Sequence, residues 1–131
     1  MSRPLKIIIA DDEVHILRVV EFKLRAAGFD VVCAHDGLQA WQEIERDHPA
    51  LLITDYQMPG INGMELAQKM FNLENLRDIP VILLTARCFS LNRDDLAKTN
   101  IVRVVPKPFS PRELLAWTQQ IFSNSTYSSG A

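Results

Sequence analysis

Short apolar runs alternate with longer amphipathic stretches along this 131-residue chain, and no other feature constrains its fold as strongly. Most of the apolar runs are rich in Val, Ile and Leu, as strands covered on both faces are. They occupy residues 5–10, 29–34, 50–54, 79–84 and 101–105. Helical patterns fill residues 13–27, 36–47, 63–73, 89–98 and 110–122. This alternation predicts a doubly wound α/β fold around a five-stranded parallel sheet with five helices.

Helix-end signals refine the boundaries of the first and last helical patterns. Gly28 is expected to end the first helix, since glycine readily adopts the left-handed cap conformation. Ser110 is a suitable N-cap for the last helix, and Glu113 would complete a capping box with it. The chain after residue 122 is polar and Ser-rich. We therefore expect one domain over residues 1–123, followed by a polar, disordered tail over residues 124–131.

Composition narrows the classes of partner and compartment. Hydrophobic residues make up 47% and charged residues 23% of the chain, which is typical of a globular domain. The formal net charge of −2 argues against nucleic acid as the main partner. Cys33 and Cys88 form no CxxC pair, so a disulfide framework is not expected. The sequence shows neither an apolar run long enough for a membrane span nor a signal peptide. We expect a cytoplasmic protein that does not engage a membrane.

Polar side chains follow four of the five predicted strands. The residues directly after the strands are Asp11, Asp12 and Glu13, then Asp55 and Gln57, then Thr85 and Ala86, and finally Lys107 and Pro108. In doubly wound sheets the functional site lies outside the carboxyl ends of the strands. The acidic pair by itself could equally be a turn and helix cap. The whole set at successive strand ends predicts that carboxylates, a hydroxyl and an ammonium converge at one edge of the sheet.

This set of side chains suits phosphoryl transfer. Carboxylates held close together raise one another's pKa unless a cation neutralises them. Mg²⁺ prefers oxygen ligands and binds through one or two carboxylates, waters and phosphate oxygens. A carboxylate can itself act as the nucleophile and form an acyl phosphate, while lysine and hydroxyl groups donate to the phosphoryl oxygens. The residues therefore predict a Mg²⁺-dependent site of this kind.

The same residues give the chain its resemblance to the response-regulator receiver family. The matching motifs are the Asp11-Asp12-Glu13 triplet, Asp55 with Met58-Pro59 and Gly63, Thr85-Ala86, and Lys107-Pro108-Phe109. The resemblance covers about residues 5–123. It implies a flavodoxin-like sheet of order 2-1-3-4-5 and a role in two-component signal transduction. The domain would accept a phosphoryl group from a histidine kinase or histidine phosphotransfer protein and signal through altered protein contacts.

The resemblance also implies roles for the phosphoryl-transfer residues. Asp55 would be the phosphoacceptor. Lys107 would pair with Asp55 and then with the phosphoryl group, to which Thr85 would donate its hydroxyl. The Lys107–Pro108 peptide bond would be cis. Gln57 and Arg87 would influence the lifetime of the phosphoryl group.

The metal ligands follow from the same resemblance. Asp12, Asp55 and the backbone carbonyl of Gln57 would bind Mg²⁺ directly, and Asp11 would act through a water molecule.

Signalling and partner surfaces are implied less fully. Family members often carry Tyr or Phe three residues before the lysine as a switch, whereas this chain carries Val104. That departure leaves the phosphorylation chemistry intact but questions the usual signalling route. On the first helix, His15, Val19 and Phe22 form a stripe at helical spacing, where the family commonly docks the phosphodonor.

Two rival functions and one architectural question stay open. Phosphatases of the haloacid dehalogenase type also use an aspartate nucleophile with Mg²⁺, but they place a second aspartate where this chain has Gln57. An interaction module that has lost phosphorylation would keep the fold without the acidic set. We expect the chain to catalyse only its own phosphorylation and dephosphorylation. It could be a stand-alone regulator or the receiver of a larger protein.

Overall fold

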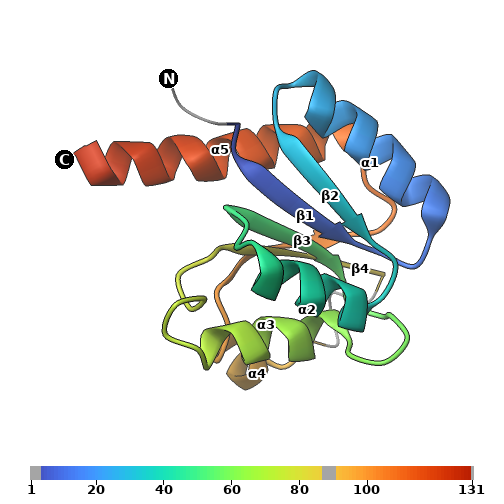
Figure 1. The fold of residues 1–131 in the computed structure, drawn as a ribbon, viewed down its shortest axis with the longest axis vertical. Helices are drawn as coiled ribbons and strands as arrows, with labels where there is room; N and C mark the ends of the chain where they lie inside the picture. Colours follow the sequence, from blue (N-terminus) through green and yellow to red (C-terminus); the bar gives the residue numbers. More distant parts are fainter. Residues whose placement is uncertain (1–3, 87–90, 131) are drawn as a thin grey trace.

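A five-stranded parallel sheet forms the centre of the molecule in a computed structural model, which describes residues 4–86 and 91–130 and side chains as far as Ser123. The strands are β1 (Lys6–Ala10), β2 (Asp30–Ala34), β3 (Leu51–Asp55), β4 (Val81–Thr85) and β5 (Ile101–Pro106). Their order is β2-β1-β3-β4-β5, and every neighbouring pair is parallel (Figure 1). The predicted fold class and strand order are confirmed.

Helices cover both faces of the sheet. They are α1 (Val14–Ala26), α2 (Gly37–Arg46), α3 (Gly63–Phe71), α4 (Arg93–Ala97) and α5 (Pro111–Gly130). In Figure 1, α1 and α5 lie on one face, and α2 and α3 lie on the other. The molecule is therefore a three-layer α/β sandwich, as the alternation of apolar runs and helical patterns predicts.

The strand residues divide between two apolar cores because successive side chains of a strand point to opposite faces. In β1, Ile7 and Ile9 pack in the core beneath α1 and α5, whereas Ile8 and Ala10 pack in the core beneath α2 and α3. All four are fully buried. Burial on both faces is the reason why the strands appear in the sequence as continuous apolar runs.

The fourth helix starts later than the sequence predicted. The predicted helix over residues 89–98 is wrong at its start, because α4 begins at Arg93 and residues 87–90 lie outside the described part of the chain. Asn92 precedes the helix, and its side chain accepts hydrogen bonds from the backbone N–H groups of Asp94 and Asp95 at 2.7 and 3.3 Å. This cap fixes the start, since it satisfies N–H groups that have no partner within the helix.

The last helix is longer than the sequence predicted. Ser110 is its N-cap, as predicted, since the Glu113 N–H donates to the Ser110 hydroxyl at 3.4 Å. The predicted end at residue 122 is wrong, because α5 continues to Gly130 through the segment that we expected to be a disordered tail. Residues 123–129 contain neither glycine nor proline, so no residue in them interrupts the helical hydrogen-bond pattern.

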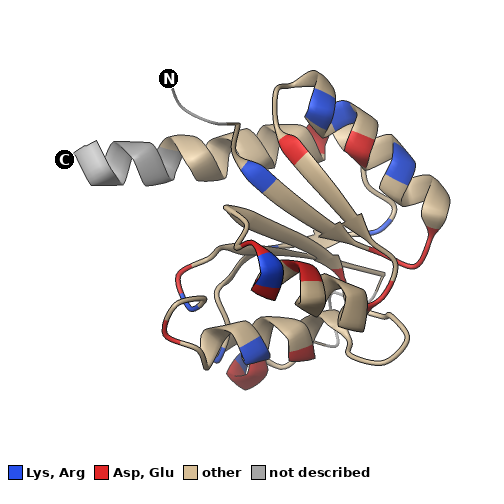
Figure 2. Ribbon diagram, viewed as in Figure 1, with Lys and Arg blue, Asp and Glu red and all other residues tan. Residues whose placement is uncertain are grey.

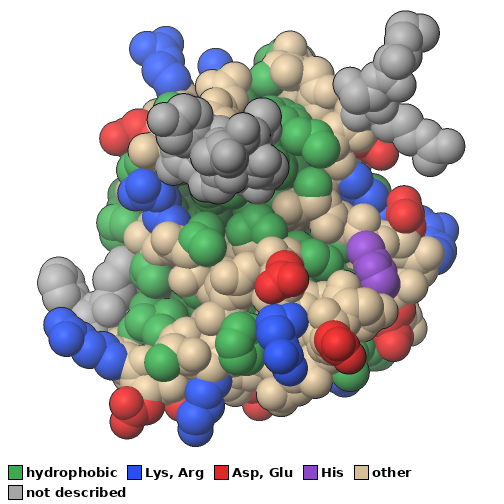
Figure 3. Space-filling view, turned by 90° about the vertical axis from the view of Figure 1, so that its left-hand side faces the viewer, with side chains coloured by type: hydrophobic (Ala, Val, Ile, Leu, Met, Phe, Trp, Pro, Cys, Tyr) green, Lys and Arg blue, Asp and Glu red, His purple; other side chains and the backbone are tan. Residues whose placement is uncertain are grey.

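The surface mixes charges and apolar side chains. Figure 3 shows the side of the molecule that lies at the left of Figure 1, where acidic, basic and apolar side chains are interspersed over the coloured part. Within the described residues, no helix is both long enough and apolar enough to span a bilayer.

Candidate functional site

Polar residues from four strands meet at the carboxyl edge of the sheet, as predicted. Asp11 directly follows β1, Asp55 ends β3, Thr85 ends β4, and Lys107 follows β5. Backbone hydrogen bonds fix these strand ends to one another. The Tyr56 N–H donates to the Leu84 carbonyl at 2.8 Å, and the Lys107 N–H donates to the Thr85 carbonyl at 2.9 Å. The sheet therefore brings together side chains that are far apart in the sequence.

Lys107 is the centre of the site. Its ammonium donates hydrogen bonds to Asp11 and to Glu13, both at 3.0 Å, and forms an ion pair with Asp55 at 3.2 Å. The Lys107 side chain is only 13% exposed. The peptide bond between Lys107 and Pro108 is cis, as the resemblance implied.

Three carboxylates form a cluster with the composition of a metal site. Asp11, Asp12 and Asp55 each offer a carboxylate oxygen, and these oxygens all lie within 4.8 Å of one another. Asp11 and Asp55 are buried, whereas Asp12 is exposed. The cluster therefore opens to solvent on the side of Asp12. Three carboxylates with one open side suit Mg²⁺, a hard cation that keeps several waters.

Burial and crowding shift the acidity of these groups. Burial and the charge of Asp11 raise the pKa of Asp55 from 3.8 to about 6, although Lys107 opposes the shift. Burial also raises the pKa of Asp11, against its hydrogen bonds with the Glu13 N–H and with Lys107. Hydrogen bonding to Lys107 lowers the pKa of Glu13. Burial lowers the pKa of Lys107, but its bonds to Glu13 and Asp11 outweigh burial and raise it overall. Lys107 is therefore a charged ammonium. Its single positive charge does not balance the carboxylates around it, so the site carries a net negative charge.

Helix α3 fixes the backbone of Asp55 from below. Gly63, its first residue, lies so close that a Cβ on it would collide with the Asp55 carbonyl oxygen. The Gly63 N–H also donates to the Tyr56 carbonyl at 2.8 Å. Asn62 and Glu65 form a reciprocal capping box that starts the helix here. This close approach explains why the motif after Asp55 contains a glycine.

A small pocket of about 100 Å³ opens beside Asp55 and Lys107. Its described lining residues are Glu13, Asp55, Gln57, Thr85, Ala86 and Lys107. Thr85 is buried, and Ala86 adds only a methyl group to the wall. The pocket thus has two carboxylates, a hydroxyl and an ammonium in its walls and space for a small tetrahedral group.

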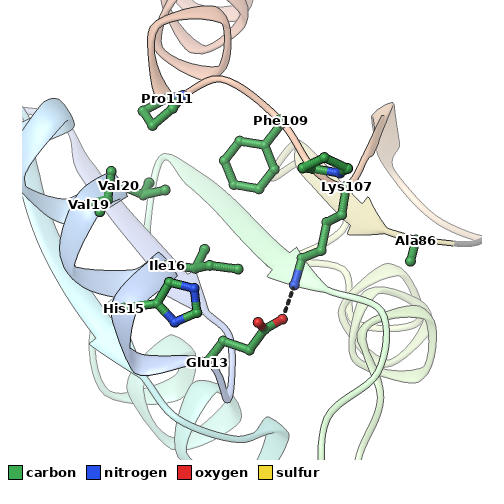
Figure 4. A pocket seen from close by; sticks show the side chains of 10 residues that line it. Glu13, His15, Ile16, Val19, Val20, Ala86, Lys107, Phe109 and Pro111 are labelled. Carbon is green, nitrogen blue, oxygen red and sulfur yellow. Dashed lines mark hydrogen bonds and ion pairs between the residues drawn. The ribbon is translucent and has the colours of Figure 1, made fainter.

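A second and larger hollow adjoins the first. This groove, of about 560 Å³, lies between α1 and the β5–α5 loop (Figure 4). Among the predicted docking residues, His15 and Val19 line it. Phe22 is 76% exposed and does not belong to its described lining. Glu13 and Lys107 line both hollows, so the groove reaches the phosphoryl-sized pocket.

The remaining predicted residues are less closely tied to the site. Arg87 lies outside the described residues. Val104 is half-buried in β5, paired in register with Leu83 of β4, and it lines neither of the two hollows. Sequence reasoning gave Glu13 no role of its own within the acidic triplet. The structure brings it to Lys107, 94 residues away, and only its acidic character in the motif could have suggested this contact.

An acidic cluster, a lysine and a hydroxyl around a small pocket at the carboxyl edge of a 2-1-3-4-5 sheet define the phosphoryl-accepting class of α/β signalling domains. The chain belongs to the response regulator receiver domain family, whose model matches residues 7–119. It is therefore a phosphoryl-accepting receiver of two-component signal transduction.

Individual relatives support the same family. The chain is 37% identical over 111 residues to the probable transcriptional regulator ycf27 of Porphyridium aerugineum, covering 85% of this chain and 45% of that protein. A putative response regulator from Chloroflexus aurantiacus is similar with a TM-score of 0.83 and 30% identity, covering 92% and 98% of the two chains.

The receiver domain of the sensor histidine kinase PA1611 from Pseudomonas aeruginosa is also similar. Its TM-score is 0.79 at 27% identity, and the likeness covers 89% of this chain and 96% of that one. That domain was solved with a magnesium ion coordinated in its active-site cleft. The chain spans less than half the length of the curated relative from Porphyridium aerugineum.

Proposed function

We propose that Asp55 is the residue that accepts the phosphoryl group. The observation that carries this proposal is its position, buried beside a pocket of about 100 Å³ with Lys107 at 3.2 Å. An Asp55 carboxylate oxygen attacks the phosphorus, the phosphorus–nitrogen bond to the donor histidine breaks, and an acyl phosphate forms. Lys107 and Thr85 then donate to the phosphoryl oxygens. Gln57, at the pocket wall, and Arg87 influence how long the acyl phosphate survives.

We propose Mg²⁺ as the cofactor. Asp12 and Asp55 bind it directly with the backbone carbonyl of Gln57, and Asp11 acts through a water molecule. The clustered carboxylates and the magnesium in the similar Pseudomonas receiver support this assignment. When bound, Mg²⁺ would neutralise the negative charges of the Asp55 carboxylate and the phosphoryl oxygens, which phosphoryl transfer brings close together. It also favours the ionised form of Asp55, which burial disfavours.

The proposed donor is a histidine kinase or histidine phosphotransfer protein that docks on α1. His15, Val19 and Phe22 are all exposed on this helix, and the groove beside it leads to the pocket. Basic residues also occur along α1 (Figure 2). An apolar stripe next to a path to Asp55 suits a partner that must present its phosphohistidine there.

A phosphotransfer assay tests the docking surface. Phe22→Ala and Val19→Ala should slow transfer from a purified phosphohistidine donor at least severalfold and leave labelling by acetyl phosphate unchanged. Leu38→Ala is the matched control, because Leu38 is 58% exposed on α2 rather than on α1. Equal transfer rates for all four proteins would exclude α1 as the docking surface.

The wider function follows from these roles. We propose that the domain turns over only its own acyl phosphate and signals through changed protein contacts. We also propose a cytoplasmic location, with which half-buried Cys33 is consistent, since it forms no disulfide with any residue that the structure describes. The expectation that nucleic acid is not a partner gains no support from the relatives, because one of them is named a transcriptional regulator.

Mass spectrometry tests the phosphoacceptor. Incubation with acetyl phosphate and Mg²⁺ should add one phosphoryl group to the protein, and Asp55→Asn should add none. Asp95→Asn is a control, since Asp95 lies on α4 away from the described pocket walls. Stoichiometric labelling of the Asp55→Asn protein would place the acceptor elsewhere.

A further inference from the structure

Glu13 stands at the N-cap position of α1 but does not cap the helix. Its side chain accepts no N–H of the first turn. The Asp11 carboxylate instead accepts the Glu13 N–H at 2.9 Å. The Glu13 side chain extends in the other direction, to the Lys107 ammonium, as Figure 4 shows. The direction of the Glu13 side chain is therefore explained by its bond to Lys107 and not by helix capping.

The contacts of Lys107 are divided unevenly. An ammonium has three N–H donors. The ammonium donates hydrogen bonds to Asp11 and to Glu13 at 3.0 Å, and its contact with Asp55 is longer, at 3.2 Å. Asp55, which must share Lys107 with an incoming phosphoryl group, is therefore not the closest partner of the lysine. Glu13, which lines both the small pocket and the groove, is one of the two closer partners.

Glu13 also adds charge where a phosphoryl group must enter. It lines the small pocket together with Asp55, and its carboxylate forms an ion pair with the Lys107 ammonium at 3.0 Å. The Glu13 side chain is 48% exposed, whereas that of Asp11 is fully buried. Of these two hydrogen-bonded partners, Glu13 is the one that can move away into solvent. The bond between Glu13 and Lys107 can therefore break with the carboxylate moving into solvent, whereas the buried Asp11 carboxylate has no such freedom.

We propose that Glu13 is a positioning residue that restrains Lys107 in the unphosphorylated domain and thereby slows the gain of a phosphoryl group at Asp55. This inference rests on the proposed function of Asp55 and Lys107. When the Glu13–Lys107 bond breaks, the ammonium is released to the phosphoryl oxygens and one anion leaves the pocket mouth. The residue thus sets the rate of phosphorylation without touching the reacting atoms.

The rate of labelling by acetyl phosphate in saturating Mg²⁺ tests the proposal. Glu13→Gln should raise the labelling rate about threefold or more, and the increase should appear at saturating acetyl phosphate. Glu13→Ser should do the same while adding a side chain that caps α1 well, so it covers the case in which the Gln variant does not fold. Glu21→Gln is the charge-matched control on the same helix, where Glu21 pairs with Arg25 and not with Lys107.

Glu13→Asp separates restraint from repulsion. It keeps the charge but is shorter by one methylene, so its bond to Lys107 is weakened. Restraint of the lysine predicts that the Asp variant is labelled faster than the wild type, toward the rate of Glu13→Gln. A wild-type rate for Glu13→Asp would show that only the charge matters and would overturn the proposal, as would an unchanged or slower Glu13→Gln. Failure of the wild type itself to be labelled would contradict the proposed function instead.

Discussion

At the residue scale, the site concentrates negative charge around one ammonium. Lys107 lies within 3.2 Å of three carboxylates, and Asp12 adds a fourth to the same edge of the sheet. Burial strengthens the mutual repulsion because the low dielectric of the interior screens charges poorly. The site is therefore electrostatically strained in the absence of a cation, and this strain should be measurable.

Asp55→Asn should stabilise the metal-free protein at neutral pH. The pKa of Asp55 is raised from 3.8 to about 6, so the folded state binds this proton more tightly than the unfolded state does. Wild-type stability therefore falls as the pH rises from about 4 to about 6 and stays lower above that. At about 1.4 kcal/mol per pKa unit, the variant should gain up to about 3 kcal/mol at pH 7.5.

Urea unfolding in EDTA at several pH values measures this effect. The gain should shrink toward zero below pH 4, where Asp55 is protonated in both states. Asp94→Asn, which makes the same substitution at an exposed position, is the control. A variant with equal stability to the wild type at pH 7.5 would show that the charge at position 55 is already compensated.

Val104→Ala should leave labelling by acetyl phosphate within about twofold of the wild type. Val104 does not belong to the described lining of the pocket, and its β-branched side chain has few rotamers with which to act as a switch. The loss of two methyl groups should cost only about 1–2 kcal/mol, because the side chain is half-buried. Labelling kinetics check the prediction, and a tenfold loss would assign this strand position a role in the chemistry.

At the element scale, two helix starts act on the site from opposite sides. Helix α1 begins beside the acidic triplet, and α3 begins directly beneath Asp55. The α3 start depends on a missing Cβ at Gly63 and on the Asn62–Glu65 capping box. Helix placement therefore determines where the Asp55 carboxyl lies relative to Lys107.

Gly63→Ala should displace Asp55 and impair both folding and labelling. The added methyl group meets backbone atoms of Asp55, which cannot move away as a flexible side chain could. Overpacking of this kind costs about 1–3 kcal/mol. We expect that loss in urea unfolding and at least a tenfold slower labelling rate in the refolded variant. Gln68→Ala, in the same helix but without new atoms near Asp55, should retain the wild-type rate.

At the scale of the whole molecule, a well-packed sheet carries at its carboxyl edge a charged cluster whose net charge a bound cation would change. Two apolar cores fix the strands from both faces. The acidic cluster is open to solvent through Asp12, so a cation can reach it without rearranging the fold. A ligand that binds only the folded state must stabilise the whole domain.

Millimolar Mg²⁺ should therefore raise the melting temperature. At a concentration of 100 times the Kd, the gain is about 2.7 kcal/mol, which corresponds to several degrees for a domain of this size. Asp12→Ala should abolish the increase without lowering stability in EDTA, because Asp12 is exposed and removal of its charge relieves repulsion. Differential scanning calorimetry measures both. An equal Mg²⁺-dependent increase in the variant would exclude Asp12 as a ligand.

The sequence by itself determined the sheet and the identity of its edge residues. Strands buried on both faces leave continuous apolar runs, so their number and approximate limits can be read directly, and parallel pairing then brings the residues that follow them to one side. Asp11, Asp55, Thr85 and Lys107 could be assigned to one site for this reason.

Only the tertiary structure decided the contacts within that site. Glu13 and Lys107 are 94 residues apart, and the direction of the Glu13 side chain depends on which partner lies nearest once the sheet has formed. The approach of Gly63 to Asp55 likewise exists only after α3 packs. Two helix limits were also left to the structure, because the start of α4 and the end of α5 depend on a balance between caps and backbone hydrogen bonds that differs by little from one residue to the next.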